Sequence, residues 1–184
     1  MALLPDVVEC GQFELRAWRP ALARQMLTAI QESLPELEQW MPWAQSAPGE
    51  ADLRGVLRQG ELDFREDRGW DYAMVAPPSG EVLGAAGIHR TDRAERFAIG
   101  YWVRSRRTGE GLATAAARAL TDAGFQCLER AQLIVITMDR ANAASAVIPR
   151  KLGYSLLGTE DREIQARGHT GRGLVFGMDR SQRT

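Results

Sequence analysis

Hydrophobic and polar residues follow one another along this chain in two different periods. Segments with apolar residues at every second position, or in short runs rich in branched and aromatic residues, predict β-strands; segments with apolar residues three and four apart predict helices. Strands are expected over residues 13–17, 70–76, 81–89, 97–103 and 133–137, with a closing hairpin formed by 154–167 and 174–178. Helices are expected over residues 21–33, 52–66, 112–127 and 142–152. This order of elements predicts a mixed α/β fold.

Proline and glycine residues mark many of the boundaries between these elements. Pro20 suits the start of the first helix, Pro35 interrupts it, and the residues from Pro77 to Gly80 turn the chain between two strands. The pattern contains no internal repeat, low-complexity segment or linker. A chain of 184 residues can bury roughly two-thirds of its unfolded surface, so residues 1–184 are expected to form a single domain.

The segment from Phe97 to Ala113 carries the strongest functional signal. An apolar strand is followed by three arginines within the four residues 104–107, and then by two glycines that precede a helix beginning at Leu112. Free N–H groups at a helix N-terminus bind anions, and glycines let a ligand approach the backbone closely. The glycines alone could serve only to make a tight turn. The neighbouring arginines favour a phosphate site.

The order of residues in this turn separates three kinds of phosphate site. A nucleotide P-loop requires Gly-Lys-Ser/Thr at the helix start, whereas Gly111-Leu112-Ala113 occurs here. A dinucleotide fingerprint requires a third small residue where Thr114 stands. The residues from Arg106 to Gly111 instead match Arg/Gln-x-x-Gly-x-Gly/Ala. This pattern resembles the coenzyme A pyrophosphate loop of the GNAT superfamily of N-acetyltransferases.

Two further segments extend the resemblance over nearly the whole chain, from about residue 15 to residue 178. The residues from Asn142 to Ser145, followed by those from Ile148 to Tyr154, are similar to the fourth helix and next strand of the RimL-like branch, which acetylates protein N-termini. The sequence Trp40-Met41-Pro42-Trp43 resembles an upstream segment that is common in the same branch. The parts occur in the order and spacing of that branch.

The resemblance implies both a fold and an activity. The fold would be a GNAT-type domain with a mostly antiparallel, twisted central sheet of six to seven strands and about four helices. The reaction would transfer an acetyl group directly from acetyl-CoA to a primary amine in a ternary complex. The acceptor would be a protein N-terminal amine of the ribosomal type, or else a small amine.

The resemblance also assigns cofactor-binding residues. A backbone N–H near Val103 and Arg104 would bind the acetyl carbonyl and stabilise an oxyanion. The pantetheine arm would follow residues 102–104, and the pyrophosphate would lie on the N–H groups of residues 107–111. The expected cofactor-binding residues are Trp102, Val103, Arg104, Arg106, Arg107, Thr108, Gly109, Glu110, Gly111, Leu112, Ala113, Asn142 and Ser145.

Ser145 is the expected proton donor to the departing thiolate, because this role is proposed for the serine of Asn-x-x-Ser in RimL-like enzymes. The alternative is that Ser145 is only a small polar residue of a helix. Many superfamily members have a tyrosine acid at the position that Pro149 occupies here. Asn142 either only caps the helix or also binds the cofactor arm.

Glu163 and His89 are alternative candidates for the general base. Many relatives have a glutamate directly before Ile-Gly-Tyr, where this chain has Ala98. Glu163 lies near a glutamate of the RimL-like branch, and His89 ends a strand and has an ordinary pKa near ~6.5. A lone histidine at a strand end is also often structural or exposed. Because a protein α-amine has a pKa near ~8, the reaction does not require a strong base.

Aromatic residues are candidates for the acceptor site. Trp40, Trp43 and Tyr72 could line it together with His89, although core packing explains the three aromatic residues equally well. His169 lies in a glycine-rich hairpin tip, where we expect it to be exposed to solvent.

Composition limits the partners and the compartment. The net charge is -1, so no general attraction to nucleic acid or to an anionic membrane is expected. No apolar run approaches the ~20 residues of a membrane span and no signal peptide is recognised, so a cytoplasmic location is expected. Cys10 and Cys127 lack metal-ligand spacing, and neither a disulfide framework nor a metal is expected. A homodimer is an open alternative to a monomer.

Two other classes of protein stay open as alternatives. A coenzyme A-binding sensor or interaction module without turnover is compatible with Ala98 and Pro149, since two groups that often act in catalysis are missing there. A dinucleotide-binding oxidoreductase would need a mainly parallel sheet. The hairpins expected over residues 70–89 and 154–178 argue against it.

Overall fold

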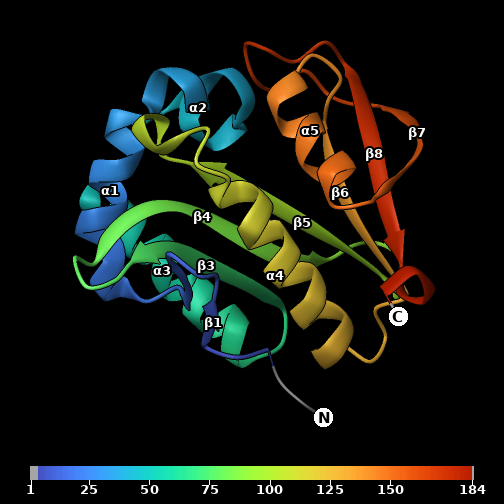
Figure 1. Cartoon of the computed structure of the whole chain (residues 1–184). Coiled ribbons are helices and arrows are strands. Elements are labelled where there is room, and N and C mark those ends of the chain that lie inside the picture. The colour runs from blue at the N-terminus through green and yellow to red at the C-terminus, as the bar shows by residue number, and fades with distance from the viewer. Residues whose placement is uncertain (1–3, 184) are drawn as a thin grey trace.

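A computed structural model describes residues 4–183 of the chain (Figure 1). Within these residues, eight strands form one sheet in the order β1-β2-β3-β4-β5-β6-β8-β7. All neighbouring strands are antiparallel except β5 and β6, which are parallel. The expected mixed α/β fold with a mostly antiparallel sheet is confirmed.

The elements lie close to the expected ranges. The strands are β1 (Val7–Glu9), β2 (Glu14–Ala17), β3 (Gly69–Ala76), β4 (Glu81–Arg90), β5 (Arg96–Val103), β6 (Leu133–Asp139), β7 (Ser155–Asp161) and β8 (Arg172–Asp179). The helices are α1 (Ala23–Glu32), α2 (Leu34–Trp40), α3 (Glu50–Arg65), α4 (Leu112–Cys127) and α5 (Ala143–Lys151).

Strand β1 was not predicted, whereas the segment after Pro35, expected as a short turn or helix reaching Trp40, forms α2. The three-residue strand β1 is too short to give a period-two pattern, and it forms only because it pairs with β2. Pro35 does interrupt the first helix, but it lies in the first turn of α2, where its missing N–H has no intrahelical role. The described part of the chain therefore has one strand and one helix more than the upper estimates from the sequence.

Helices cover both faces of the sheet. Alternate side chains of β3, β4 and β5 point to opposite faces. One face packs on α4 and α5 through residues such as Ile88 and Ile99, and the other packs on α1 and α3 through residues such as Ala73 and Val75. In Figure 1, α4 lies in front of the sheet and α3 lies behind it. A ligand site between the strands is therefore bordered by different helices on its two sides.

The sheet opens between β5 and β6. Their parallel pairing covers only four residue pairs and ends at Ile99 and Ile136. Beyond that point β5 stays paired with β4 as far as Val103, while β6 stays paired with β8 as far as Asp139. The two strands therefore diverge, as Figure 1 shows, and one edge of each is left without a partner strand.

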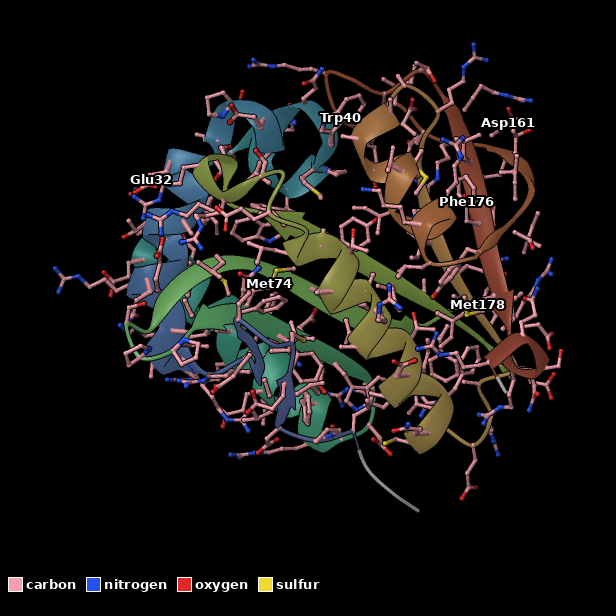
Figure 2. The ribbon with its side chains drawn as sticks, in the orientation of Figure 1. Glu32, Trp40, Met74, Asp161, Phe176 and Met178 are labelled. Carbon is pink, nitrogen blue, oxygen red and sulfur yellow. The ribbon has the colours of Figure 1, made fainter. Side chains whose placement is uncertain are left out.

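Arg104 fixes the end of β5 after this divergence. Its backbone N–H donates to Leu83 O at 2.8 Å, so the ladder with β4 continues to this residue. Its guanidinium is only 5% exposed and binds Glu81 at 3.1 Å and Glu32, whose carboxylate accepts from Nε at 2.7 Å. The Arg104 hydrogen bond holds the pKa of the Glu32 carboxyl below its usual range. Figure 2 marks Glu32 at the end of α1, so this network ties the strand to the helix.

We expect Arg104→Ala to lower the free energy of unfolding by about 2 kcal/mol, because hydrogen bonds to two charged groups are lost at a buried position. Arg106→Ala is the matched control: its guanidinium binds the same two carboxylates but is 57% exposed. The control should leave stability nearly unchanged. Urea unfolding measures both variants, and equal losses would show that Arg104 does not anchor the strand.

Candidate active site

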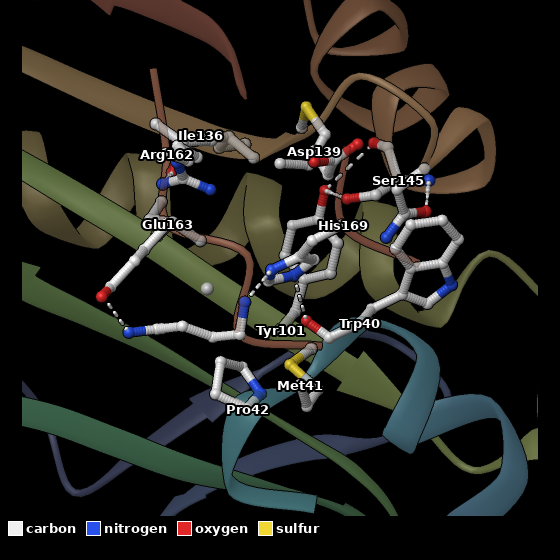
Figure 3. A pocket seen from close by; sticks show the side chains of 16 residues that line it. Trp40, Met41, Pro42, Tyr101, Ile136, Asp139, Ser145, Arg162, Glu163 and His169 are labelled. Carbon is white, nitrogen blue, oxygen red and sulfur yellow. Dashed lines mark hydrogen bonds between the residues drawn. The ribbon is translucent and has the colours of Figure 1, made fainter. Parts of the chain in front are cut away.

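Two cavities adjoin at the open end of β5. The first, of about 450 Å³, lies between β5, β6, α5 and the segment 162–169 (Figure 3). The second, of about 500 Å³, lies on the face that carries α1 and α3. Met41, Gly100 and Tyr101 line both cavities. The two cavities therefore adjoin at these three residues.

Ser145 lies in the first cavity and contacts a tyrosine that the sequence analysis had not selected. Its hydroxyl is 3.2 Å from the Tyr101 hydroxyl, which also donates to Ser145 O at 3.3 Å. Burial raises the pKa of Tyr101 to about 12, against the opposing effect of the Ser145 hydrogen bond, so the phenol is neutral at physiological pH. The only sequence signal for Tyr101 was its place in Ile-Gly-Tyr at the end of a strand.

Asn142 positions Ser145 by capping α5. Its Oδ1 accepts the Ser145 backbone N–H at 3.1 Å, as an N-cap side chain does. The capping alternative for Asn142 is thus observed. Binding of the cofactor arm by its amide remains a prediction.

Asp139 joins the end of β6 to the loop before β8. The buried carboxylate accepts the backbone N–H groups of Ala141 at 2.9 Å and Thr170 at 2.8 Å, and also the Thr170 hydroxyl at 2.9 Å. Burial alone would raise the pKa of Asp139, but these hydrogen bonds outweigh it and hold the pKa below its usual value. The wall of the first cavity opposite β5 is therefore fixed by an ionised carboxylate.

His169 is half-buried rather than solvated, which corrects the expectation from its glycine-rich surroundings. Its Nδ1 accepts the Gln165 backbone N–H at 3.3 Å, so Nε2 carries the proton and donates to Trp40 O at 3.1 Å. The ring thus ties the hairpin to the end of α2, a contact between residues 129 apart that no local pattern reveals.

Glu163 lines the first cavity as an exposed side chain. Its carboxylate accepts from Gln165 Nε2 at 2.7 Å. Figure 3 shows Glu163 and Ser145 on opposite sides of the cavity. The structure thus keeps this candidate base apart from the candidate acid, and its role remains a prediction.

The glycine-bearing turn presents backbone donors at the start of α4. Gly109 and Gly111 have φ values of 83° and 80°, which side-chain-bearing residues rarely adopt. The N–H groups of Arg107 and Thr108 are used within the turn, by Arg104 O and Ser105 O. Among the described residues, no protein acceptor meets the N–H groups from Gly109 to Thr114, because the first helical bond is Ala115 N to Gly111 O. These donors fit a pyrophosphate.

Other residues of the turn are structural. Leu112 is buried in the core and Ala113 is half-buried beside it. The Thr108 hydroxyl donates to Ser105 O at 2.8 Å. These three expected cofactor-binding residues offer backbone groups or a van der Waals surface rather than free polar side chains.

The local positive charge expected from the arginines is offset in the structure. Arg106 binds Glu81 at 2.7 Å, and Arg107 binds Glu110 at 2.8 Å and Glu81 at 3.4 Å. Arg104 is buried between Glu32 and Glu81. The three arginine side chains are thus paired with three carboxylates. The electrostatic part of the sequence argument is corrected, and the case for anion binding rests mainly on backbone N–H groups and the α4 dipole.

Val103 is the better placed of the two expected oxyanion donors. Arg104 N–H is used by Leu83 O. Because successive N–H groups along a strand point to opposite edges, the Val103 N–H faces away from β4 toward the opening beside β6. The Trp102 side chain lies on the other face, in the second cavity, with its ring centroid 6.2 Å from that of Trp43.

His89 and Asp71 form a pair at the floor of the second cavity. His89 Nε2 lies 3.0 Å from Asp71 Oδ1. This hydrogen bond raises the pKa of His89, with burial opposing it and the charges of Asp71 and Asp63 adding to it. Nε2 therefore donates to Asp71 and Nδ1 is the basic nitrogen.

A glycine makes room for this pair. A Cβ at Gly87 would lie 2.3 Å from Asp71 Oδ1 and 2.7 Å from His89 Nε2. His89 is paired across the strands with Ala98. Asp71 was missed by the sequence analysis, although period-two alternation places it on the same face as Gly87.

The three aromatic candidates for an acceptor wall separate in the structure. Trp43, 44% exposed, lines the second cavity, and Trp40 lines the first. Tyr72 has no exposed surface and its hydroxyl donates to Pro5 O at 2.9 Å, so it lines neither cavity. Its expected place in the acceptor wall is therefore corrected: it is a core residue.

Sequence comparison gives the family. A profile described as the acetyltransferase (GNAT) domain matches residues 12–155. The chain belongs to the GNAT acetyltransferase family. It is also 25% identical over 143 residues to YdaF of Bacillus subtilis (strain 168), which carries a provisional ribosomal N-acetyltransferase name; the match covers 76% of each chain.

Structural comparison agrees with this family. A RimL ribosomal L7/L12 α-N-protein acetyltransferase in complex with coenzyme A superposes with a TM-score of 0.85 at 17% identity, covering 94% of this chain and 97% of the other. Mycobacterium smegmatis RimJ in complex with a CoA-disulfide gives 0.83 at 24% identity, covering 95% and 88%. At these identities the superpositions show a shared GNAT fold. The activity of this chain as an N-acetyltransferase follows from the family.

Residues 4–183 contain no group of three or more His, Cys, Asp or Glu side chains that could hold a metal ion. Over the same residues, no helix has the length and apolar character needed to span a membrane.

We expect Gly111→Asp to abolish acetyl-CoA binding, because it places a negative side chain beside the free N–H groups. The measurement is the shift of the unfolding midpoint by acetyl-CoA. Gly153→Asp is the matched control, since Gly153 also has a left-handed φ, of 83°, and open space around its Cβ position. The control should bear the backbone strain yet keep the shift. If Gly111→Asp still responded as the wild type does, the pyrophosphate would have to lie elsewhere.

Proposed function

We propose that this N-acetyltransferase acts on a primary amine, either a protein N-terminal amine of the ribosomal type or a small amine, by direct transfer in a ternary complex. The observation that carries this proposal is the pair of cavities that meet at Gly100 and Tyr101. One opens beside the unpaired edge of β5 and the other beside the His89–Asp71 pair. We place the activity in one domain, residues 1–184, and in the cytoplasm.

The donor side of the proposal uses mainly backbone groups. The pyrophosphate of acetyl-CoA lies on the N–H groups from Gly109 to Gly111, with the exposed Arg106 beside it. The pantetheine arm follows the open edge of β5, and the acetyl carbonyl accepts the Val103 N–H. A fixed donor directed at a developing oxyanion lowers the barrier to acyl transfer without reorganising during the reaction.

The chemical step exchanges one bond for another. The amine nitrogen forms a C–N bond to the acetyl carbon, and the C–S bond of the thioester breaks. The Ser145 hydroxyl gives a proton to the sulfur, and the Tyr101 O–H, 3.2 Å away, turns from Ser145 O to stabilise the serine oxygen. The nitrogen loses one proton to a base. After the products leave, the base returns this proton to solvent and Ser145 takes one up, so charge and protons balance.

His89 is the base that the geometry favours. It lines the second cavity together with Gly100, and its cross-strand neighbour is Ala98, where relatives often have a carboxylate. Nδ1, which lies beside Gly69, takes the proton through a water molecule, while Asp71 stabilises the imidazolium. Glu163 is the alternative, on the far side of the first cavity from Ser145.

We expect Ser145→Ala to lower kcat about a hundredfold, which is within the usual rate effect of removing a general acid. The affinity for acetyl-CoA should be unchanged. The assay follows coenzyme A release with a panel of N-terminal peptides and small amines. Ser155→Ala, at the start of the exposed edge strand β7, is the control. An unchanged kcat in Ser145→Ala would remove this serine from the mechanism. Absence of turnover with every amine would support the coenzyme A-binding module instead.

The pH dependence distinguishes the two bases. A histidine base must be neutral, so kcat/KM should fall as pH drops below the His89 pKa, which lies above its ordinary value. Asp71→Asn removes the main cause of the raised pKa and should move this acidic limb to lower pH. Glu163→Gln should leave the limb in place. The reverse pattern, with the limb moved by Glu163→Gln and not by Asp71→Asn, would make Glu163 the base.

A further inference from the structure

The second cavity has walls of apolar side chains from three elements and a loop. They are Met26 and Ile30 of α1, Leu53 and Val56 of α3, Trp43 after α2, and Trp18 after β2. Trp102 of β5 packs on Trp43 with ring centroids 6.2 Å apart. Pockets of this volume and character bind small apolar groups in proteins. The cavity is therefore built to hold a hydrocarbon or aromatic group.

Charge is confined to one place in this cavity. Of the lining residues in the described part of the chain, only Asp71 and His89 have side chains that can be charged near neutral pH. They lie on neighbouring strands, on the floor, and are joined by their 3.0 Å hydrogen bond. An acidic side chain on the floor, hydrogen-bonded to His89, attracts an ammonium group. An apolar wall with a single anionic end matches a cationic head on an apolar body.

Glycines open the floor toward the first cavity. No atom lies within 4 Å of the position that a Cβ of Gly100 would occupy, and Gly100 lines both cavities. Gly87, its partner across the strands, gives room to Asp71 and His89. A nitrogen bound over Gly100 therefore lies beside both the charged pair and the cavity that holds Ser145.

We propose that the acceptor is an amine whose adjoining carbon chain bears a bulky apolar or aromatic group, and that this group occupies the second cavity while the nitrogen lies over Gly100 beside Asp71 and His89. The inference rests on the proposed function and names the class of amine. A short polar side chain, such as that of an N-terminal serine, would leave most of the 500 Å³ unfilled and would bring a hydroxyl against apolar walls.

The proton follows the same route as in the proposed reaction. The ammonium binds beside Asp71 and loses its first proton to solvent. The resulting neutral amine attacks the acetyl carbon, and its nitrogen gives the second proton to His89. His89 returns this proton to solvent after the product leaves.

The test compares acceptors that differ only in their apolar group, with the full chain at saturating acetyl-CoA. Phenylethylamine is paired with ethylamine, and a peptide beginning with Phe is paired with the same peptide beginning with Ser. The apolar member of at least one pair should have a kcat/KM more than about tenfold higher, the scale on which apolar pockets discriminate. The two pairs show whether the amine is a free small molecule or a chain terminus.

A matched pair of variants locates the effect. Val56 and Leu62 both lie on α3 with exposed side chains, 51% and 40%, but only Val56 lines the cavity. Val56→Asp should raise KM for the apolar acceptor about tenfold without altering kcat or acetyl-CoA binding. Leu62→Asp should behave as the wild type does. Unfolding midpoints confirm that both variants are folded.

The outcomes separate this inference from the proposed function. If the Ser peptide and ethylamine were the better substrates, or if the two aspartate variants behaved alike, the inference would be overturned while the N-acetyltransferase proposal stood. If acetyl-CoA bound but no amine were acetylated, both would fail. Preference for the apolar acceptors, lost in Val56→Asp alone, supports the assignment.

Discussion

The separation of β5 from β6 is the constraint on which the rest of this structure depends. The parallel strands β5 and β6 share only four residue pairs. Beyond these pairs β5 stays paired with β4, and β6 stays paired with β8. Backbone groups that a sheet normally pairs are thereby left facing an opening, where an unpaired buried donor is costly. A ligand with acceptor atoms can meet these donors. The opening is thus a site made from the omission of hydrogen bonds rather than from the addition of reactive side chains.

Such an opening persists only if both of its sides are held apart. Arg104 ties the end of β5 to β4 and α1 through three acceptor groups. Asp139 ties the end of β6 to the loop before β8 by accepting hydrogen bonds from the backbone N–H and the hydroxyl of Thr170. Both anchors are buried charges with complete sets of partners. Removing one partner of such a charge strongly destabilises the folded protein. The same anchoring consumes Arg104, so the charged residue nearest the opening is structural.

The sequence was informative where function depends on local backbone conformation. Glycines that adopt a left-handed φ, the start of α4, the Asn142 cap and the order of strands and helices all follow from residues close together in the chain. The sequence was misleading where the role of a residue depends on partners that are distant in the chain. Arg104 and Arg106 of the turn bind Glu32 and Glu81, more than twenty residues distant.

Other errors have the same origin. Tyr72 was a candidate for the acceptor wall as well as for the core, and tertiary packing buries it completely. His169 belongs to a glycine-rich tip, but it binds the end of α2. Tyr101 and Asp71 became candidates only when folding placed them against Ser145 and His89. Strand alternation fixed the face on which each lies, but not the partner that it meets there.

The central claim is that acetyl-CoA binds in the opening between β5 and β6 through the free backbone donors. The most direct measurement is the unfolding midpoint with acetyl-CoA, compared with the midpoints with ATP and NADH. At about 100 times its dissociation constant, acetyl-CoA should add roughly 2.7 kcal/mol of stability and raise the midpoint clearly. ATP and NADH should have little effect. No shift with acetyl-CoA, or an equal shift with all three ligands, would contradict the claim.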